Sequence, residues 1–255
     1  MNRETSTAKN SFTYGATFFV LLLLWQLLSY IAHIPFIPSP LKVFNNLYAI
    51  FLPSICKHLL YSLWRITAGI LLSAVVGIPL GLCMGYWKRL DSLLSPAAYF
   101  LYPIPKIALL PIAMLVLGLG DTSKIVMIML IVVFQVLIAS RDAVRGIPKE
   151  TYHAFDSLGA GSLSIFRRII IPAVLPALFS SVRVSLGTAL SVLFFTETFG
   201  TNFGMGYFIM DAWMRVNYIE MYSGILVLSV TGLLLFVVID VLEAVLCPWR
   251  NPLPK

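Results

Sequence analysis

The sequence has 255 residues, of which 59% are hydrophobic and only 11% are charged, and its mean hydropathy is +0.91. A soluble domain contains about 25% charged residues and about 45–50% apolar ones, so this composition excludes a soluble globular protein. Several apolar runs approach the roughly 20 residues that a helix needs to cross a bilayer, and most of them lack a polar face. We therefore predict an all-α integral membrane protein that forms a single domain over 1–255.

Six stretches, taken in chain order, are predicted to span the membrane. They cover about 18–32, 62–87, 101–119, 123–139, 173–199 and 221–246. The first could instead be a signal peptide, but it has no clear small-x-small cleavage site, which favours an uncleaved span. The third is interrupted by Pro103, Pro105 and Pro111, which disfavour regular helix.

The basic residues predict the orientation of these spans. Cytoplasmic loops of membrane proteins are enriched in Lys and Arg, and most of the eighteen Lys and Arg residues fall on one side if both termini are cytoplasmic. The basic residues on the other side are then Lys42, Lys57, Lys124 and Arg215. This topology accounts for the net charge of +7 without a nucleic-acid partner.

A polar segment separates the fourth and fifth spans, where residues 150–176 read ETYHAFDSLGAGSLSIFRRIIIPAVLP. Its local signals predict two short helices. The first ends near Leu158, and Gly159 then allows a turn at which a side chain would clash. Ser162 is a candidate N-cap for the second helix.

The second short helix is predicted to carry Arg167 and Arg168 in its last turn, where cations are favoured, and Pro172 marks the entry into span five. The pattern alone fits two kinds of element equally well. One is an amphipathic helix that lies on lipid headgroups. The other is a rigid knob that docks on a cytosolic partner.

The same segment resembles the cytoplasmic coupling motif of binding-protein-dependent ABC importer permeases, which reads EAA, three residues, G, nine residues, I-x-L-P. The positions that match the motif are Ala154, Gly159, Ile169 and Pro172, and those that depart from it are His153, Phe155 and Ile171. The motif's glutamate helps to fix the loop or its ATPase contact, so the departure at His153 affects contact chemistry more than geometry.

The resemblance covers almost the whole chain from about Pro38 onward. The stretches IPSPLKVFNNL, GIPLGLCMGYWKRLDSLLSP, YPIPKIALLPIAMLVLGLGDTSKI and RVSLGTALSVLFFTETFGTNFGMGYFI occur in the order and spacing typical of permeases of the nitrate/sulfonate/taurine importer group. The resemblance implies a type I ABC importer permease fold, with a coupling helix in about 148–170. It also implies a translocation pathway for a small solute, such as an organic sulfonate, nitrate or a similar anion.

The partners follow from the same resemblance. A second copy of this chain, giving a homodimer, would assemble with two cytosolic ABC ATPase subunits and an extracytoplasmic solute-binding protein in a bacterial inner membrane. The residues expected to couple to the ATPase are Ala154, Phe155, Asp156, Leu158, Gly159, Ala160 and Pro172. The sequence contains no G-x-x-x-x-G-K-[ST] phosphate loop. We therefore expect no enzymatic activity and no cofactor on this chain, with ATP and Mg²⁺ bound by the ATPase subunits.

Three ionisable residues are candidates for the pathway. Arg183 lies about 16 Å past Pro172 by helical rise, so it could attract an anion near the midplane or form an ion pair between helices. Lys106 follows two prolines and could line the pathway or snorkel to the interface. Glu197 repels anions and is expected to be an outer structural or gate residue; it lies about 21 Å from Arg183 along one helix, which excludes a direct pair.

Other classes of function have weaker support in the sequence. The cysteines and histidines show no metal-ligand spacing, so no metal site is expected. An ion-coupled secondary transporter with an interfacial helix remains the alternative, although such proteins often show internal repeats and acidic residues in the middle of spans. Neither feature is visible here.

Overall fold

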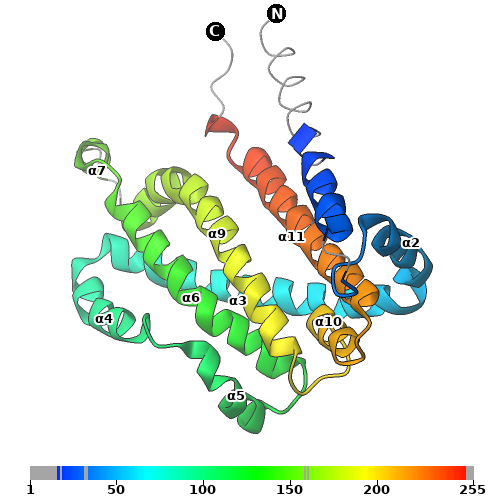
Figure 1. Cartoon of the computed structure of the whole chain (residues 1–255). Helices are drawn as coiled ribbons and strands as arrows, with labels where there is room; N and C mark the ends of the chain where they lie inside the picture. Colours follow the sequence, from blue (N-terminus) through cyan, green and yellow to red (C-terminus); the bar gives the residue numbers. More distant parts are fainter. Residues whose placement is uncertain (1–15, 18, 32–33, 158, 160, 251–255) are drawn as a thin grey trace, which may run out of the picture.

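The computed structural model describes residues 16–17, 19–31, 34–157, 159 and 161–250, which are almost entirely helical and include no β-strand (Figure 1). The all-α prediction is therefore confirmed. Helices satisfy their backbone hydrogen bonds internally, which is what a chain needs where no water is available.

The helices are as follows in chain order. They are the N-terminal helix Phe19–Ile31, α2 Pro40–Ile50, α3 Cys56–Tyr86, α4 Lys88–Leu101, α5 Leu110–Leu117, α6 Asp121–Arg145, α7 Lys149–Asp156, α8 Ser162–Ile165, α9 Ile171–Glu197, α10 Met205–Met214 and α11 Tyr218–Leu246. A π-helical turn at Phe51–Ile55 joins α2 to α3, and another at Phe166–Ile170 joins α8 to α9.

Four helical segments are long and apolar enough to cross a membrane. They are Pro40–Tyr86, Asp121–Arg145, Ser162–Glu197 and Tyr218–Leu246. A fifth crossing arises if α4 and the short helices over Lys106–Leu117 are taken as one span bent by 78°. The described N-terminal helix Phe19–Ile31 is apolar but shorter than these.

The bent pair is where the structure departs most from the predicted spans. We expected one span over 101–119, but α4 ends at Leu101 and regular helix resumes only at Leu110, after a 3₁₀ turn that begins at Lys106. Pro103 and Pro105 lie in the gap between them. Because proline removes a backbone donor and clashes with the preceding turn, two of them in close succession end the helix.

The contact between α3 and α6 is the most extensive in the bundle, and glycines on α3 make it close. A Cβ atom added at Gly81 would lie 2.3 Å from the backbone oxygen of Leu137, and one at Gly69 would lie 2.6 Å from a side-chain carbon of Ile128. Small residues of this kind let two helix backbones approach each other in lipid, where packing drives association.

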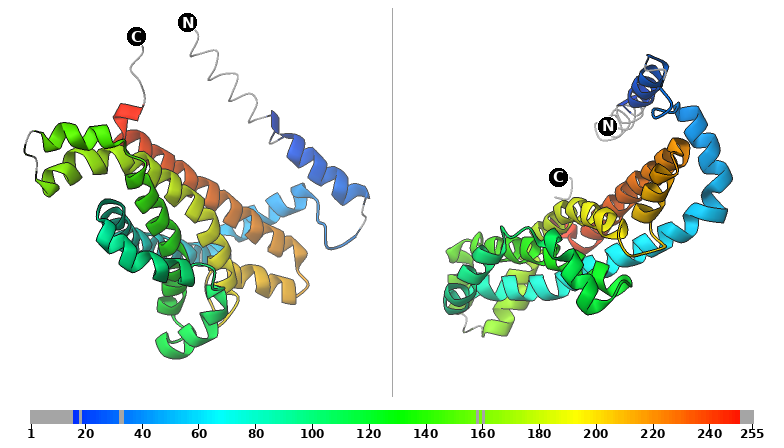
Figure 2. Two further views of the ribbon diagram at one scale, coloured as in Figure 1. Left: turned by 90° about the vertical axis from the view of Figure 1, so that its left-hand side faces the viewer. Right: turned by 60° about the horizontal axis from the view of Figure 1, so that its bottom comes forward.

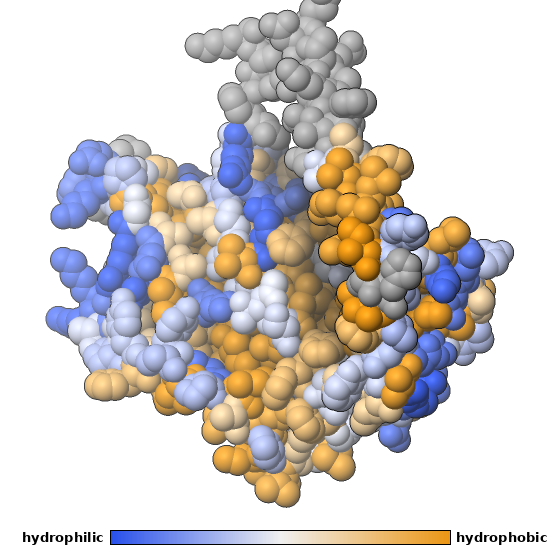
Figure 3. Space-filling model, viewed as in Figure 1, coloured by the Kyte–Doolittle hydropathy of each residue, from blue (hydrophilic) through white to orange (hydrophobic). Residues whose placement is uncertain are grey.

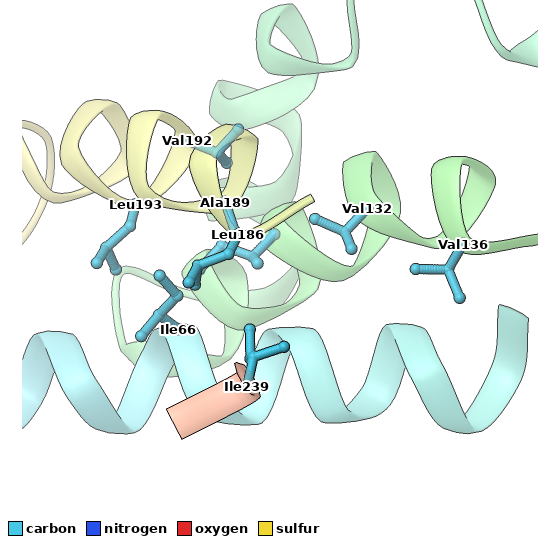
Figure 4. Close-up of a cluster of buried hydrophobic side chains, with 9 residues drawn as sticks. Ile66, Val132, Val136, Leu186, Ala189, Val192, Leu193 and Ile239 are labelled. Atoms are coloured by element: carbon cyan, nitrogen blue, oxygen red, sulfur yellow. The ribbon is translucent and has the colours of Figure 1, made fainter. Parts of the chain in front are cut away.

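The main buried cluster lies where four long helices meet. Figure 4 shows Ile66 from α3, Val132 and Val136 from α6, Leu186, Ala189, Val192 and Leu193 from α9, and Ile239 from α11. α9 therefore packs on both members of the α3–α6 pair, and α11 closes the cluster from the other side.

Apolar side chains also cover much of the outer surface. In Figure 3 they gather over the lower part of the molecule, around α5, whereas hydrophilic residues gather at the left, around α4 and α7. Leu115 on α5 is 87% exposed. The N-terminal helix stands at the edge of the bundle (Figure 2), where Trp25 stacks on Tyr222 of α11 with ring centroids 5.8 Å apart. A surface of this kind fits lipid or partner helices.

We expect Gly81→Ala to lower the free energy of unfolding by about 1–3 kcal/mol, because the new methyl group must push α3 away from the backbone of α6. Thermal unfolding of the detergent-solubilised protein measures the change. Gly187→Ala on α9 is the matched control, since a Cβ atom added there would meet nothing within 4 Å. Equal melting temperatures for the two variants would contradict close packing at Gly81.

Candidate functional site

The segment between α6 and α9 projects beyond the end of the bundle. α7 and the helix that begins with α8 lie next to each other there and are separated from most of the other helices (Figures 1 and 2). The turn between them includes Gly159, whose φ is +70°. A left-handed conformation of this kind is costly for residues other than glycine, which is the physical reason for the glycine predicted at this turn.

The inner face of this segment is anchored by aromatic packing. Tyr152 and Phe155 of α7 pack on a buried cluster that includes Ile165 and Ile169. Tyr86, at the end of α3, lies with its ring centroid 6.3 Å from that of Tyr152. Burial raises the pKa of the Tyr152 phenol above its ordinary value, and Tyr86 adds a smaller effect in the same direction. The projecting segment is therefore fixed to α3 as well as to its own flanking helices.

The outer face of the segment is exposed. His153, Ser157 and Gly159 are exposed, and Leu163 in the first turn of α8 is 83% exposed. A single exposed leucine is ordinary on a protein surface, so Leu163 is of interest only for its position on a segment that projects from the bundle. Sequence reasoning missed Leu163, although an apolar residue two positions after Gly161 could have indicated it.

The residues predicted to couple to an ATPase are distributed as follows. Ala154, Phe155 and Asp156 lie on α7, Gly159 lies in the turn, and Pro172 lies near the start of α9, whereas Leu158 and Ala160 fall outside the described residues. Phe155 is half-buried, so its ring supports the segment from inside.

Two details of the predicted second helix were wrong. Its N-cap is Gly161 rather than Ser162, which is already the first helical residue and makes no side-chain cap. Arg167 and Arg168 do not lie in a last turn, because the helix continues through the π-helical turn into α9. Ile169 and Ile170 are buried in this turn, and their packing favours continuation over termination at the arginines.

At the opposite end of the bundle, a buried network of charges joins three helices. Arg65 of α3 donates to Glu197 of α9 through Nη1 at 2.8 Å and to Asp121 of α6 through Nη2 at 2.7 Å. Ser62 donates to both carboxylate oxygens of Glu197, at 2.9 and 2.8 Å. Glu197 is fully buried, so its charge is stabilised entirely by these partners and by backbone donors.

The loop that follows α9 closes over this network. The Gly206 backbone N–H donates to Glu197 at 2.9 Å, and Arg65 donates to the Phe203 backbone oxygen at 2.7 Å. A Cβ atom at Gly204 would lie 2.4 Å from the Glu197 carboxyl carbon, and its φ of +128° also requires glycine. Glu197 therefore fixes the start of α10, in keeping with the structural role expected for it.

Lys124, which sequence reasoning placed in an external loop, is fully buried beside this network. Its Nζ donates to the backbone oxygens of Leu119 at 2.8 Å and Gly120 at 3.2 Å. A lysine at the start of a long apolar helix can look like a loop residue in sequence. Here the carbonyls of the preceding turn accept its hydrogen bonds and permit burial.

The other two pathway candidates have protein partners. Arg183 of α9 forms ion pairs with Asp240 and with Glu243 of α11, the latter at 2.6 Å. This is the interhelical ion pair that the sequence left as one of two alternatives. Lys106 is 8% exposed, and its Nζ donates to the Tyr102 backbone oxygen at 2.9 Å. Lys106 therefore does not extend freely to an interface.

Within the described residues, no group of three or more His, Cys, Asp or Glu side chains could hold a metal ion. The arrangement instead combines a helical bundle of membrane-spanning length, a helical projection at one end and a loop fixed by buried charges at the other. This architecture is that of a multi-pass helical membrane protein.

Comparison with known proteins identifies the family. Residues 77–251 match the family described as the binding-protein-dependent transport system inner membrane component, and the chain belongs to this family. It is 29% identical to the putative aliphatic sulfonates transport permease protein SsuC of Bacillus subtilis, covering 91% of this chain and 85% of that protein. It is also 29% identical to the taurine transport system permease protein TauC of Escherichia coli, covering 92% and 88% respectively.

A solved structure supports the fold. One inward-facing conformation of the MetNI methionine ABC transporter matches with a TM-score of 0.64 and 17% identity, covering 72% of this chain and 92% of that chain. The resemblance drawn from the coupling motif is confirmed at the level of the family and fold. The chain is a permease subunit of an ABC importer, a transport component rather than an enzyme.

We expect Glu197→Ala to lower the free energy of unfolding by about 1–3 kcal/mol, because the Ser62 hydroxyl, the Gly206 N–H and the Arg65 Nη1 group would lose a buried acceptor, while Arg65 keeps its pair with Asp121. Thermal unfolding in detergent measures the loss. Asp240→Asn is the control: Asp240 is 58% exposed and Arg183 keeps Glu243, so the change should stay below about 1 kcal/mol. Equal losses of stability in Glu197→Ala and Asp240→Asn would contradict a stabilising role for the buried network around Glu197.

Proposed function

We propose that two copies of this chain form the translocation pathway of an ATP-driven importer for a small anionic solute, such as an organic sulfonate. The relatives named for aliphatic sulfonates and for taurine support the solute class. An extracytoplasmic binding protein would deliver the solute, and two separate ATPase subunits would bind ATP and Mg²⁺ in a bacterial inner membrane.

The observation that carries the proposal is the shape of the α7–α8 projection. Its inner face is held by Tyr152 and Phe155, while Leu163 and Gly159 are exposed at its outer side. A projection built in this way can transmit force, because the packed aromatic rings resist displacement relative to α3. We infer that residues 148–170 sit in a groove of the ATPase subunit.

The continuous helix supplies a route for that force. Ser162–Glu197 has 36 residues, which is about 54 Å by helical rise. Its first turn carries Leu163, and its last residue, Glu197, fixes the loop before α10. Displacement of the projection by ATPase closure would therefore reach the opposite end of the bundle and shift the spans between inward-open and outward-open arrangements.

The proposed orientation follows the distribution of charge. Arg145, Lys149, Arg167 and Arg168 lie at or next to the projection, so that end is assigned to the cytoplasm by the preference of basic residues for this side. Both termini are assigned to the same side. The loop after α9 and α10 then face the binding protein.

An ion-coupled secondary transporter is disfavoured by the state of the carboxylates. Proton-coupled transporters carry a carboxylate or histidine within the spans that the proton can occupy. On the four long described helical segments, each Asp or Glu forms an ion pair with an arginine: Asp121, Asp142, Glu197, Glu220, Asp240 and Glu243. This pairing supports an energy source outside the chain.

The test of the proposal is Leu163→Ser in the complex purified with its ATPase subunits and reconstituted in liposomes with its binding protein. We expect ATP-dependent import to fall at least about tenfold and ATPase co-purification to weaken, since a contact leucine contributes roughly 1.5–3 kcal/mol when buried. The control is Leu93→Ser on α4, where the leucine is 72% exposed but lies outside the projection. Import by the unmodified chain without any ATPase would overturn the proposal.

A further inference from the structure

A largely apolar groove that also carries several hydroxyl groups and one amide lies between α6, α9 and the elbow that joins α4 to the 3₁₀ turn. Its volume is about 690 Å³. Tyr99 and Tyr102 line it from the elbow, Gln135 from α6, and Ser180, Ser181 and Ser185 from α9. None of these residues was singled out by sequence reasoning.

The groove reaches the middle of the spans. Ser185 lies about 21 Å from Ile171 and about 18 Å from Glu197 along α9, and Gln135 lies about 21 Å from Asp121 along α6. Polar groups at this depth are costly unless they form hydrogen bonds. The amide of Gln135 on α6 and the serine hydroxyls on α9 lie at this depth, so a role that offsets the cost of their burial is needed.

The Tyr99 hydroxyl accepts from Arg141 at 3.0 Å, but several other polar groups of the groove lack partners in the described chain. Ser185 is 1% exposed, yet its Oγ makes no hydrogen bond, and neither does the Gln135 Oε1 atom. Within the same part of the chain, the only bond of the Gln135 amide is a long one, from Nε2 to Thr188 Oγ1 at 3.4 Å. Ser180 and Ser181 also have no hydrogen bond through their hydroxyls among the described residues.

Serines elsewhere in the long helices behave differently. Ser73, Ser140, Ser191 and Ser229 each donate to the backbone oxygen four residues earlier, which satisfies a hydroxyl in lipid without any ligand. Ser185 has the same local option and does not use it. The hydroxyls that line the groove on partly exposed residues are therefore those of Ser180 and Ser181, while the Ser185 Oγ and Gln135 Oε1 atoms are unpartnered but buried behind its surface.

The charge around the groove selects the kind of ligand. No carboxylate is among its lining residues. Lys106 is not among the lining residues, but it contacts one of them: its Nζ donates to the Tyr102 backbone oxygen and lies 5.7 Å from the Tyr102 ring centroid. No acidic side chain pairs with Lys106 among the described residues. Arg183 does not line the groove, since its partners are on α11.

We infer that this groove is a transit site for the solute, in which Gln135 and the serines of α9 hydrogen-bond a small anion and Lys106 supplies the attracting charge. The inference rests on the proposed function and identifies where on this chain the solute is held. The donors that match the acceptor oxygens of a sulfonate or similar oxyanion are the serine hydroxyls and the second N–H of the Gln135 Nε2 amide, since the Gln135 Oε1 atom can only accept. Weak binding suffices, because a transit site must also release its solute.

The experiment uses the full complex in liposomes, with taurine, ethanesulfonate and nitrate as probes. Gln135→Glu keeps the shape of the side chain but adds a negative charge in a low-dielectric site, so we expect the initial import rate to fall at least about tenfold. Gln135→Leu removes only hydrogen bonds and should cause a smaller loss, of about threefold to tenfold. Lys106→Gln should also slow import, and Lys106→Arg should restore it. Ser229→Ala on α11 is the control.

The outcomes separate this inference from the proposed function. If the unmodified complex imports none of the probes or does not retain its ATPase, the proposed function fails. If import and ATPase retention are normal but both Gln135 variants match the unmodified complex, the groove is not a transit site. If the import rates of Gln135→Glu and Gln135→Leu fall by the same factor, the claim that the groove selects an anion is overturned. Basal ATP hydrolysis and co-purification of the ATPase show in each case that a variant has folded.

Discussion

The close approach of α3 to α6 is the constraint on which the other contacts depend. Ser73 of α3 donates to the Met129 backbone oxygen of α6 at 3.3 Å as well as to its own helix, which is feasible only because the backbones nearly touch. Lipid offers helices little hydrophobic gain from associating, so close packing and a few polar contacts must hold them together. α9 then packs across this pair, and its polar side faces α6 and the elbow.

Charged residues act as long-range ties in this bundle. Arg65 and Glu197 are separated by 132 positions in the chain, and Arg183 and Glu243 by 60. In low-dielectric surroundings a buried charge must have a partner, so each pair specifies which helices are neighbours. The Arg65–Glu197 pair lies at the α10 end of the bundle, and the Arg183–Glu243 pair joins α9 to α11 nearer the opposite end. The groove lies on another face of α9 at the level of Arg183, and among the described residues its lining contains no carboxylate, while Lys106 bonds the backbone of the lining residue Tyr102.

The sequence predicted the long helices well because a long run of apolar residues can be recognised from the local sequence alone. Apolar runs located α3, α6, α9 and α11 to within a few residues at most ends. The interruption at the prolines was predicted, but the helix α4 before it and the bend between the two were missed, because an apolar run divided by prolines still has the composition of one span. The charge network could not be predicted, since nothing local pairs Arg65 with Glu197. The groove was missed for a similar reason: serine and glutamine in a span signal nothing until the helices that carry them are placed opposite each other.

The burial of Glu197 under backbone also limits how this protein can vary. Positions 204 and 206 lie against its carboxylate, Thr201 bonds the Arg65 guanidinium, and the Phe203 backbone oxygen accepts from the same group. Asn202, by contrast, is exposed. This loop, which the proposed orientation places on the side of the binding protein, therefore has little freedom to diverge in sequence. Adaptation to a new binding protein would have to come mainly from the exposed side chains of neighbouring segments, while the backbone of this loop stays constant.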